Sequence, residues 1–393
     1  MYEPSAHHFP NLAFLWPAFA AASLSEIAAA AARQFTSLAV GYEAGTALPE
    51  QRWVTPNKVV LELAGVRLRD FSAADQGAEP PAEQGGLPTL LCAPLALHGA
   101  NISDLAERHS LVGTLCAAGV AHLFVTDWRS ASAEMRYFGI DDYLAALNVL
   151  VDHIGPPIDL IGMCQGGWMA LIYAARFPGK VRKLVLAAAP IDIAAGASPL
   201  SALAEASPVA MFEELIRLGE GRIAGRNIQK FWGPETIEAA AIQEVLQSDY
   251  DLRSSGFARL AAAFRDWYSW TLDLPGAYFL EVVEKLYKSN ALARGDFVAL
   301  GQKVDLARVN IPIFMLAASD DELVAPEQLF AVERLVGTQP HQIGRATARC
   351  RHVGLFMGRH VLADVWPQIA RWLTTPIVAN TSRLFEASLR RVE

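Results

Sequence analysis

The chain is poor in cysteine and in charge, and both shortages limit what it can do. Its 393 residues include 4 cysteines, and charged residues make up 19%. Cys92, Cys116, Cys164 and Cys350 lie far apart, without the short spacings of a metal site or a disulfide framework. We therefore expect no metal, free thiols and a reducing, cytoplasmic setting.

Basic residues are also scarce, with 33 Lys and Arg against 41 Asp and Glu and a net charge of -8. A nucleic-acid partner requires a basic surface, so this balance argues against one. The chain has no phosphate-binding loop and no dinucleotide fingerprint, so no bound cofactor is expected. Hydrophobic residues, in contrast, make up 52%, enough for a large core and an apolar pocket or partner surface.

No uninterrupted apolar run reaches the roughly 20 residues of a membrane span. The strongest candidate, residues 14–32, is interrupted by Pro17 and Glu26, and no Lys or Arg precedes it as in a signal peptide. We expect neither a transmembrane segment nor a signal peptide. Residues 1–54 are interpreted as a helical arm that packs on the body, on the partner in a homodimer, or on an apolar surface.

One stretch carries a specific signal: Gly162-Met163-Cys164-Gln165-Gly166-Gly167. An apolar run precedes it and a helix-forming stretch follows it. A strand, a sharp turn and a helix, with small residues two before and two after the central one, form a nucleophile elbow. A cysteine there has its thiolate stabilised by the helix N-terminus. The motif predicts an α/β-hydrolase fold with Cys164 as nucleophile; the alternative is a structural cysteine in a glycine-rich turn.

Strand and helix patterns alternate on both sides of this motif. Strands are expected at residues 58–63, 66–71, 89–94, 121–126, 183–187 and 313–317, and helices at 105–116, 143–154 and 362–372. Asp141 or Asp142 is expected to cap the second helix, and Gly155 to end it. This alternation predicts a mostly parallel sheet with helices on both faces.

Residues 193–298 break the alternation with several aromatic-rich helices, as a cap inserted into the core does. The expected organisation is therefore an arm (1–54), a core in two parts (55–192 and 299–380) around the cap (193–298), and a C-terminal tail (381–393). Most cap aromatics are expected to form the cap's own core and a few to line a substrate entrance: Phe212, Phe231, Trp232, Phe264, Trp267, Tyr268, Trp270, Tyr278 and Phe279.

In this fold the nucleophile is followed along the chain by an acid and then by a base. An acidic turn follows the strand at 313–317, and Asp321 is the expected acid, with Asp320 as the alternative. A carboxylate at this position holds the tautomer and orientation of the basic imidazole. A solvated acidic turn is the competing interpretation.

His352 is the expected base, because it precedes Gly354 and an apolar run that leads into the last helix. His341 and His360 are rivals, but neither stands before such a turn. His352 would take the proton of the Cys164 thiol.

Acyl transfer also needs two N–H donors for the oxyanion that forms at the reacting carbonyl. One is expected from Gln165, the residue after the nucleophile. The other is expected from the loop after the strand at 89–94, at Leu95 or alternatively Ala96.

These motifs together resemble polyhydroxyalkanoate synthases. The elbow is similar to that family's G-x-C-x-G-G box, and His352-Val353-Gly354 is similar to its H-[VI]-G segment. Further similar segments lie at 125–128, 141–143, 189–192, 274–277, 290–292 and 304–312, so the resemblance covers roughly residues 55 to 375. It implies a Cys164–His352–Asp321 triad that polymerises 3-hydroxyacyl-CoA through a thioester on Cys164.

Two departures from the synthase pattern bear on the direction of the reaction. Glu322 stands where synthases commonly carry a His, and Arg351 where a Gly usually precedes the base. The intracellular polyhydroxybutyrate depolymerases also use Cys, Asp and His. The Cys164-Gln165 pair resembles theirs, and residues 356–359 and 367–369 are similar to the segments with which they end. They usually lack the two glycines that follow. Dienelactone hydrolases have a similar box but are shorter and lack the large cap.

The expected function is therefore cysteine-dependent acyl transfer in polyhydroxyalkanoate metabolism, of the synthase type. The alternative is hydrolysis of 3-hydroxyacyl esters by an intracellular depolymerase or (thio)esterase. A third reading is a catalytically silent granule-associated protein. The expected partners are 3-hydroxyacyl-CoA or a polyhydroxyalkanoate ester, the polymer granule surface and a second copy of the chain. CoA would be a substrate or a product, not a cofactor.

Overall fold

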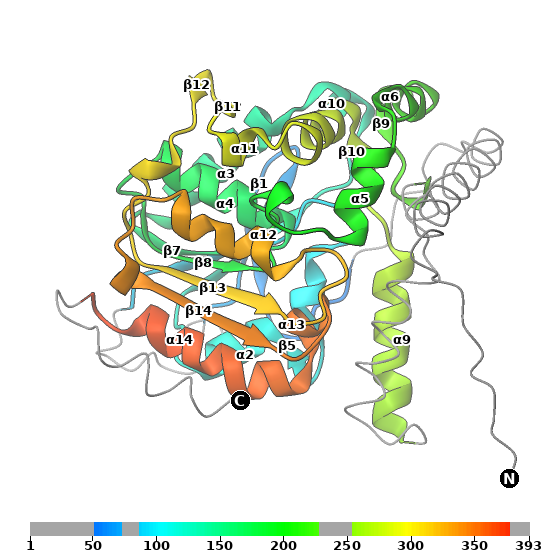
Figure 1. Cartoon of the computed structure of the whole chain (residues 1–393). Coiled ribbons are helices and arrows are strands. Elements are labelled where there is room, and N and C mark those ends of the chain that lie inside the picture. Colours follow the sequence, from blue (N-terminus) through cyan, green and yellow to red (C-terminus); the bar gives the residue numbers. More distant parts are fainter. Residues whose placement is uncertain (1–50, 73–85, 228–253, 378–393) are drawn as a thin grey trace, which may run out of the picture. The chain divides into compact units, whose positions relative to one another are not determined.

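The computed structural model describes residues 51–72, 86–227 and 254–377 (Figure 1). The chain divides into two units, residues 1–43 and 44–393, and the first lies wholly outside the described residues. Most of the expected arm, the expected tail, and Phe231 and Trp232 of the expected cap therefore also lie outside them.

The second unit is built on an eight-stranded sheet. In spatial order its strands are β1 (Lys58–Glu62), β2 (Val66–Asp70), β6 (Leu123–Trp128), β3 (Thr89–Cys92), β7 (Ile158–Met163), β8 (Val181–Ala187), β13 (Ile313–Ala318) and β14 (Ile343–Ala348). Strand β2 runs antiparallel to both neighbours, and every other adjacent pair is parallel. This order, with its single reversed strand, is that of the α/β-hydrolase fold, so the predicted fold class is confirmed.

Helices cover both faces of the sheet (Figure 1). On one face lie α2 (Leu111–Ala117) and α14 (Trp366–Thr374), which pack on each other; on the other lie α3 (Ile140–Ile154), α4 (Gln165–Arg176) and α12 (Pro326–Phe330). Strands β7 and β13 are buried along their whole length. Burial on both faces accounts for their nearly continuous apolar sequences.

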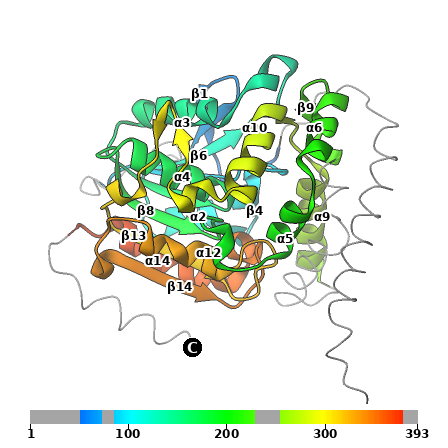
Figure 2. The same cartoon turned by 45° about the horizontal axis from the view of Figure 1, so that its top comes forward.

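The cap region lies between β8 and β13. It contains α5 (Pro199–Ala206), α6 (Val209–Leu218), β9 (Arg222–Ile223), α9 (Ser255–Ser269), β10 (Leu274–Pro275), α10 (Gly276–Glu281), a π-helix (Val282–Lys288), α11 (Ala291–Arg294), β11 (Val298–Ala299) and β12 (Gln302–Lys303). Figures 1 and 2 place α5, α6, α9 and α10 together along one side of the core, the side toward which β13 and β14 point. This region therefore stands at the carboxyl ends of the parallel strands.

Shorter elements complete the described chain. They are β4 (Asp104–Ala106), β5 (His109–Ser110), α13 (Gly354–Met357), a second π-helix (Val361–Val365), and 3-10 turns at Ala100–Ser103, Ala133–Tyr137, Ile193–Ala195, Leu306–Arg308, Ala331–Arg334 and Pro340–Gln342. Among the helices described here, none has both the length and the apolar character needed to cross a bilayer.

The predicted helix over 105–116 was wrong in its first half. Strands β4 and β5 pair there, and α2 begins only after Ser110. The Ser110 hydroxyl accepts a hydrogen bond from the Gly113 amide and so caps the helix. The Asp104 carboxylate meanwhile accepts from the amides of Val54 and Thr55. That long-range contact, which local periodicity does not report, holds residues 104–106 extended.

The predicted cap of the next helix was also wrong. Helix α3 starts after Gly139, and Asp142 instead accepts a hydrogen bond from the Gly139 amide at 2.7 Å. Gly155 does end the helix, with φ of 93°. Strand β14 was not predicted, because its sequence is only partly apolar; as an edge strand it is mostly half-buried or exposed.

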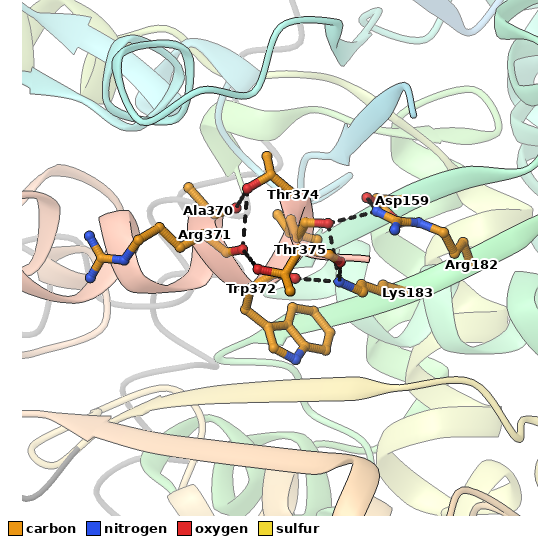
Figure 3. Close-up of polar contacts among 9 residues, drawn as sticks. Asp159, Arg182, Lys183, Ala370, Arg371, Trp372, Thr374 and Thr375 are labelled. Carbon is orange, nitrogen blue, oxygen red and sulfur yellow. Dashed lines mark hydrogen bonds and ion pairs between the residues drawn. The ribbon is translucent and has the colours of Figure 1, made fainter. Parts of the chain in front are cut away.

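Two basic side chains of β8 hold the end of the last helix onto the sheet (Figure 3). Lys183, 3% exposed, donates to the carbonyl oxygens of Trp372, Leu373 and Thr375. Arg182 donates to the Leu373 carbonyl as well, and pairs with Asp159. The last carbonyls of a helix have no partner within it, so these donors satisfy them.

Burial, and next the charge of Arg182, lower the pKa of Lys183 to about 8 from 10.5. Between pH 8 and 10.5 the folded state gives up this proton before the unfolded chain does, so the free energy of unfolding should rise with pH relative to a Lys183→Met variant. Urea unfolding of both proteins across this range measures the difference. Lys303→Met, at a lysine whose side chain is 68% exposed, controls for the loss of one positive charge. If the free energy of unfolding of the wild type instead fell with pH relative to Lys183→Met, the three carbonyl oxygens would stabilise the ammonium by more than burial destabilises it.

Candidate active site

Cys164 occupies the sharp turn between β7 and α4, as the motif predicts. Its backbone has φ of 47° and ψ of -119°, a conformation rare for a residue with a side chain. The surrounding core holds the turn, since the Cys164 amide donates to the Ala187 carbonyl oxygen at 2.8 Å. Its side chain is partly exposed at the N-terminus of α4.

The glycines around Cys164 are required by close approaches of the backbone. A Cβ on Gly162 would lie 2.6 Å from the Cα of Gly167, and one on Gly166 would lie 2.2 Å from the Cys92 carbonyl oxygen. A Cβ on Gly167 would lie 2.3 Å from the Cβ of Ala189. Any larger residue would push α4 away from β7 and its neighbours, and would move Cys164 with it.

His352 and Asp321 meet although 31 residues separate them. Asp321 follows β13, and His352 follows β14, the next strand of the sheet. The His352 Nδ1 lies 2.9 Å from both carboxylate oxygens of Asp321. The Asp321 carboxylate also accepts from the amides of Leu323 and Val324, at 2.9 and 2.8 Å. These amides fix the carboxylate so that it in turn orients the imidazole.

His352 also interacts with Cys164. Burial by itself lowers the pKa of His352, but the negative charges of Asp321 and Cys164 and hydrogen bonds to both side chains outweigh it. The pKa of His352 therefore lies well above its usual value. An imidazole placed between a carboxylate and a thiol is arranged to accept the thiol proton. The structure thus brings together the three side chains expected from the sequence.

The rival residues lie elsewhere. Asp320 is exposed and accepts from the Ser319 hydroxyl at 2.8 Å. His360 is exposed and its Nε2 lies 3.2 Å from the Arg349 carbonyl oxygen. His341 is exposed in a 3-10 turn ahead of β14.

The expected oxyanion donors lie on α4 and on the loop after β3, which meet where Gly166 approaches the Cys92 and Ala93 carbonyl oxygens. Gln165 begins α4. Leu95 lies in the loop after β3 and is 1% exposed. The core holds this loop at Ala93, whose amide donates to the Thr126 hydroxyl at 2.9 Å and whose carbonyl accepts from the Trp128 indole at 2.8 Å.

Within the described residues, the backbone amides of Gln165, Leu95 and Ala96 have no hydrogen-bond acceptor. Leu95 is buried, and a buried amide is rarely left without an acceptor. The Gln165 amide, at the first residue of α4, has no partner within the helix. A site for an anionic oxygen is consistent with this arrangement. Leu95 and Ala96 remain alternatives for the second donor.

Sequence reasoning missed the neighbours that surround this site. Tyr287, in the π-helix, accepts a hydrogen bond from Gln165 Nε2 at 2.7 Å. Tyr278 donates to the Leu95 carbonyl oxygen at 3.0 Å, and its ring lies in a buried cluster. Tyr278 was among the nine cap aromatics named from the sequence, but without a contact to the loop after β3, and Tyr287 was not named. No local pattern separates an aromatic side chain that packs within the cap from one that contacts the core.

Two further polar and aromatic residues of this region have packing partners. Asp127 forms a buried ion pair with Arg69 at 2.7 Å. Trp168 is fully buried and donates to the Gln165 side chain. No group of three or more His, Cys, Asp or Glu residues suited to a metal ion occurs in the described part of the chain.

Comparisons with known proteins add an independent observation. The family model described as the C-terminus of PHB de-polymerase matches residues 240–376. The Poly(3-hydroxyalkanoate) polymerase subunit PhaC of Synechocystis sp. is 28% identical over 342 residues, covering 81% of this chain and 84% of that protein. The protein with the same name in Haloferax mediterranei is 25% identical over 327 residues, covering 81% of this chain.

The chain is thus similar in sequence to poly(3-hydroxyalkanoate) polymerases over 81% of its length, at 25 to 28% identity. This confirms the resemblance inferred from the motifs. The chain spans 63% of the length of the Haloferax relative. Among solved structures, a bromoperoxidase from Bacillus anthracis is 17% identical, with a TM-score of 0.47 over 81% of this chain and 99% of that one. The fold assignment itself rests on the strand order.

Asp321→Asn separates the two candidate acids. The amide keeps an oxygen for the Leu323 and Val324 amides but loses the charge, so the pKa of His352 should fall, as followed by NMR of its ring protons. If His352 is the catalytic base, kcat should fall about 10³-fold or more. Asp320→Asn, one residue away and exposed, is the matched control. It should leave the pKa of His352 unchanged and kcat within about twofold of the wild type. The reverse ranking would make Asp320 the acid.

Proposed function

We propose that this protein is a cysteine-dependent acyltransferase that polymerises 3-hydroxyacyl-CoA through a thioester on Cys164. The observation that carries the proposal is the contact of His352 with both Asp321 and Cys164 on a nucleophile elbow. The names of the relatives give the substrate class, since several are called poly(3-hydroxyalkanoate) polymerases.

In the first half-reaction, His352 takes the Cys164 proton and the sulfur attacks the thioester carbonyl of the substrate. The negative oxygen that forms is held by the amides of Gln165 and of Leu95 or Ala96. The C–S bond to CoA then breaks, and His352 returns the proton to the leaving thiolate. One thioester replaces another, so the step is close to thermoneutral.

In the second half-reaction, the hydroxyl of another 3-hydroxyacyl group attacks the acyl group on Cys164. His352 accepts the hydroxyl proton, an ester bond forms and the sulfur leaves. Asp321 stabilises the imidazolium that exists in both halves. Polymerisation therefore needs no group beyond those that the site holds.

In the second half-reaction, the hydroxyl must react with the acyl group on Cys164 faster than water does. Tyr278 of the cap region stacks on Trp168 of α4, and both rings are buried. A dry, aromatic contact between the cap region and the core supports transfer over hydrolysis.

The alternative is hydrolysis of 3-hydroxyacyl esters by the same three residues. The match to the depolymerase C-terminal model over residues 240–376 favours it, as does Glu322. The Glu322 carboxylate accepts from the His352 amide at 3.3 Å, and burial, the largest influence, raises its pKa. A protonatable acid next to the base is a difference from the synthase pattern that bears on the reaction direction.

The location of the protein and its oligomeric state belong to the same proposal. We place the protein in the cytoplasm, at the surface of polymer granules, and as a homodimer. The expected domain boundaries at 54, 192, 298 and 380 likewise remain predictions.

A paired assay of the wild type and Cys164→Ala tests the function. One arm supplies 3-hydroxybutyryl-CoA and follows CoA release and polymer; the other supplies amorphous polyhydroxybutyrate and follows free acid. We expect CoA release with polymer, abolished by Cys164→Ala. Cys116→Ala, a change at a thiol in α2, controls for general loss of cysteine.

Each other outcome decides against the leading version. Acid from polymer without CoA consumption would establish the depolymerase, and CoA release without polymer a thioesterase. If the folded wild type showed no activity in either arm, both the synthase and the hydrolase would be rejected, and a catalytically silent granule-associated protein would be favoured.

A further inference from the structure

Two tyrosines of the cap region contact the two positions expected to form the oxyanion hole. The Tyr278 hydroxyl donates to the Leu95 carbonyl oxygen at 3.0 Å. The Tyr287 hydroxyl accepts from Gln165 Nε2 at 2.7 Å. Tyr278 lies in α10 and Tyr287 in the π-helix that continues it, so one segment reaches both sides of Cys164.

On the first side, the hydrogen bond acts directly on the peptide unit that carries the Ala96 amide, and on the residue whose own amide is the other candidate donor. A peptide bond is planar, so the Leu95 carbonyl and the Ala96 amide are fixed together. Because Ala93 is anchored by Thr126 and Trp128, Tyr278 fixes the next stretch of the loop. Tyr278 is 2% exposed, so its hydroxyl has little room to shift.

On the second side, the orientation of the Gln165 amide is set by Trp168. The indole N–H can only donate, and it points at Gln165 Oε1 at 2.5 Å. The NH₂ group of Gln165 is therefore left for the Tyr287 hydroxyl. Gln165 is held at both ends of its amide, directly after Cys164.

Both rings are close enough to Cys164 to be affected by its charge. Burial first, and then neighbouring groups that include Cys164, raise the pKa of Tyr278 and of Tyr287. Both hydroxyls therefore stay protonated when a thiolate reacts. They act as neutral partners in hydrogen bonds and do not compete for the thiol proton.

We propose that Tyr278 and Tyr287 are positioning residues that hold the two sides of the oxyanion hole in register with Cys164. The proposal rests on the proposed acyl transfer, because an oxyanion arises only there. It also means that α10 and the π-helix must be seated on the core before acyl transfer is efficient.

The test compares two reactions of Cys164 in single-turnover experiments. Acylation by a p-nitrophenyl acyl ester, followed as the p-nitrophenol burst, and by 3-hydroxybutyryl-CoA passes through an oxyanion. Alkylation by iodoacetamide displaces iodide at a saturated carbon and forms none. The variants are Tyr278→Phe, Tyr287→Phe and the double variant.

Tyr143→Phe is the matched control. Its ring lies 5.0 Å from that of Tyr278, and its buried hydroxyl has no hydrogen-bond partner within the described residues. The change is chemically the same but removes no hydrogen bond. It should leave acylation and alkylation as in the wild type.

We expect acylation to fall about tenfold in each single variant and further in the double variant, since small displacements of a donor cost rate steeply. The rate of alkylation by iodoacetamide should change less than twofold. The KM for the acyl donor should stay close to that of the wild type. Unchanged acylation in both single variants would overturn the proposal. A parallel fall of acylation and alkylation would also overturn it, because the effect would then lie in the thiol or in the fold.

The p-nitrophenyl arm keeps this proposal separate from the proposed function. A wild type that is acylated by the ester but not by 3-hydroxybutyryl-CoA would end the proposed function, while the variants still decide the role of the tyrosines. A wild type whose Cys164 is acylated by neither would end both.

Discussion

The strained turn at Cys164 is the constraint on which the rest of the site depends. A residue with a side chain holds φ of 47° there, a conformation that costs of order 1–3 kcal/mol. It persists because glycines at 162, 166 and 167 let β7, α4 and the loop after β3 close to contact distance. The strain lifts the sulfur out of the sheet edge, where side chains from other strands can reach it.

The parallel sheet supplies those side chains. Asp321 and His352 follow β13 and β14, which are adjacent and parallel, so their carboxyl ends meet at one edge. Loops at that edge have room for polar groups because the strands beneath them are rigid and apolar. The Asp321 carboxylate lies in a nearly dry position, with 1% of its side chain exposed, where it contacts His352 and accepts from two backbone amides. The opposite end of the sheet, where Lys183 and Arg182 hold α14, contributes stability instead (Figure 3).

The cap region contacts this scaffold on either side of the nucleophile elbow. Its tyrosines contact the loop after β3 and the start of α4, so the same segment that covers the site also touches the parts expected to stabilise the oxyanion. An enzyme that must exclude water gains from this arrangement, since its chemistry is then favoured only when the site is covered. Synthesis and hydrolysis differ in which nucleophile reaches the acyl group, and that choice depends on the covering segment more than on the three residues beneath it.

Local sequence determined the sheet strands with strong apolar patterns, the elbow at Cys164, and the order nucleophile, acid, base along the chain, because each depends on neighbours within a few residues. It also favoured Asp321 over Asp320 and His352 over its rivals, which agrees with their contacts. Only the tertiary structure decided that residues 104–106 are extended and that Tyr278 and Tyr287 reach the site. Those features come from contacts between segments up to 183 residues apart, and no periodicity within a segment carries information about a partner so distant along the chain.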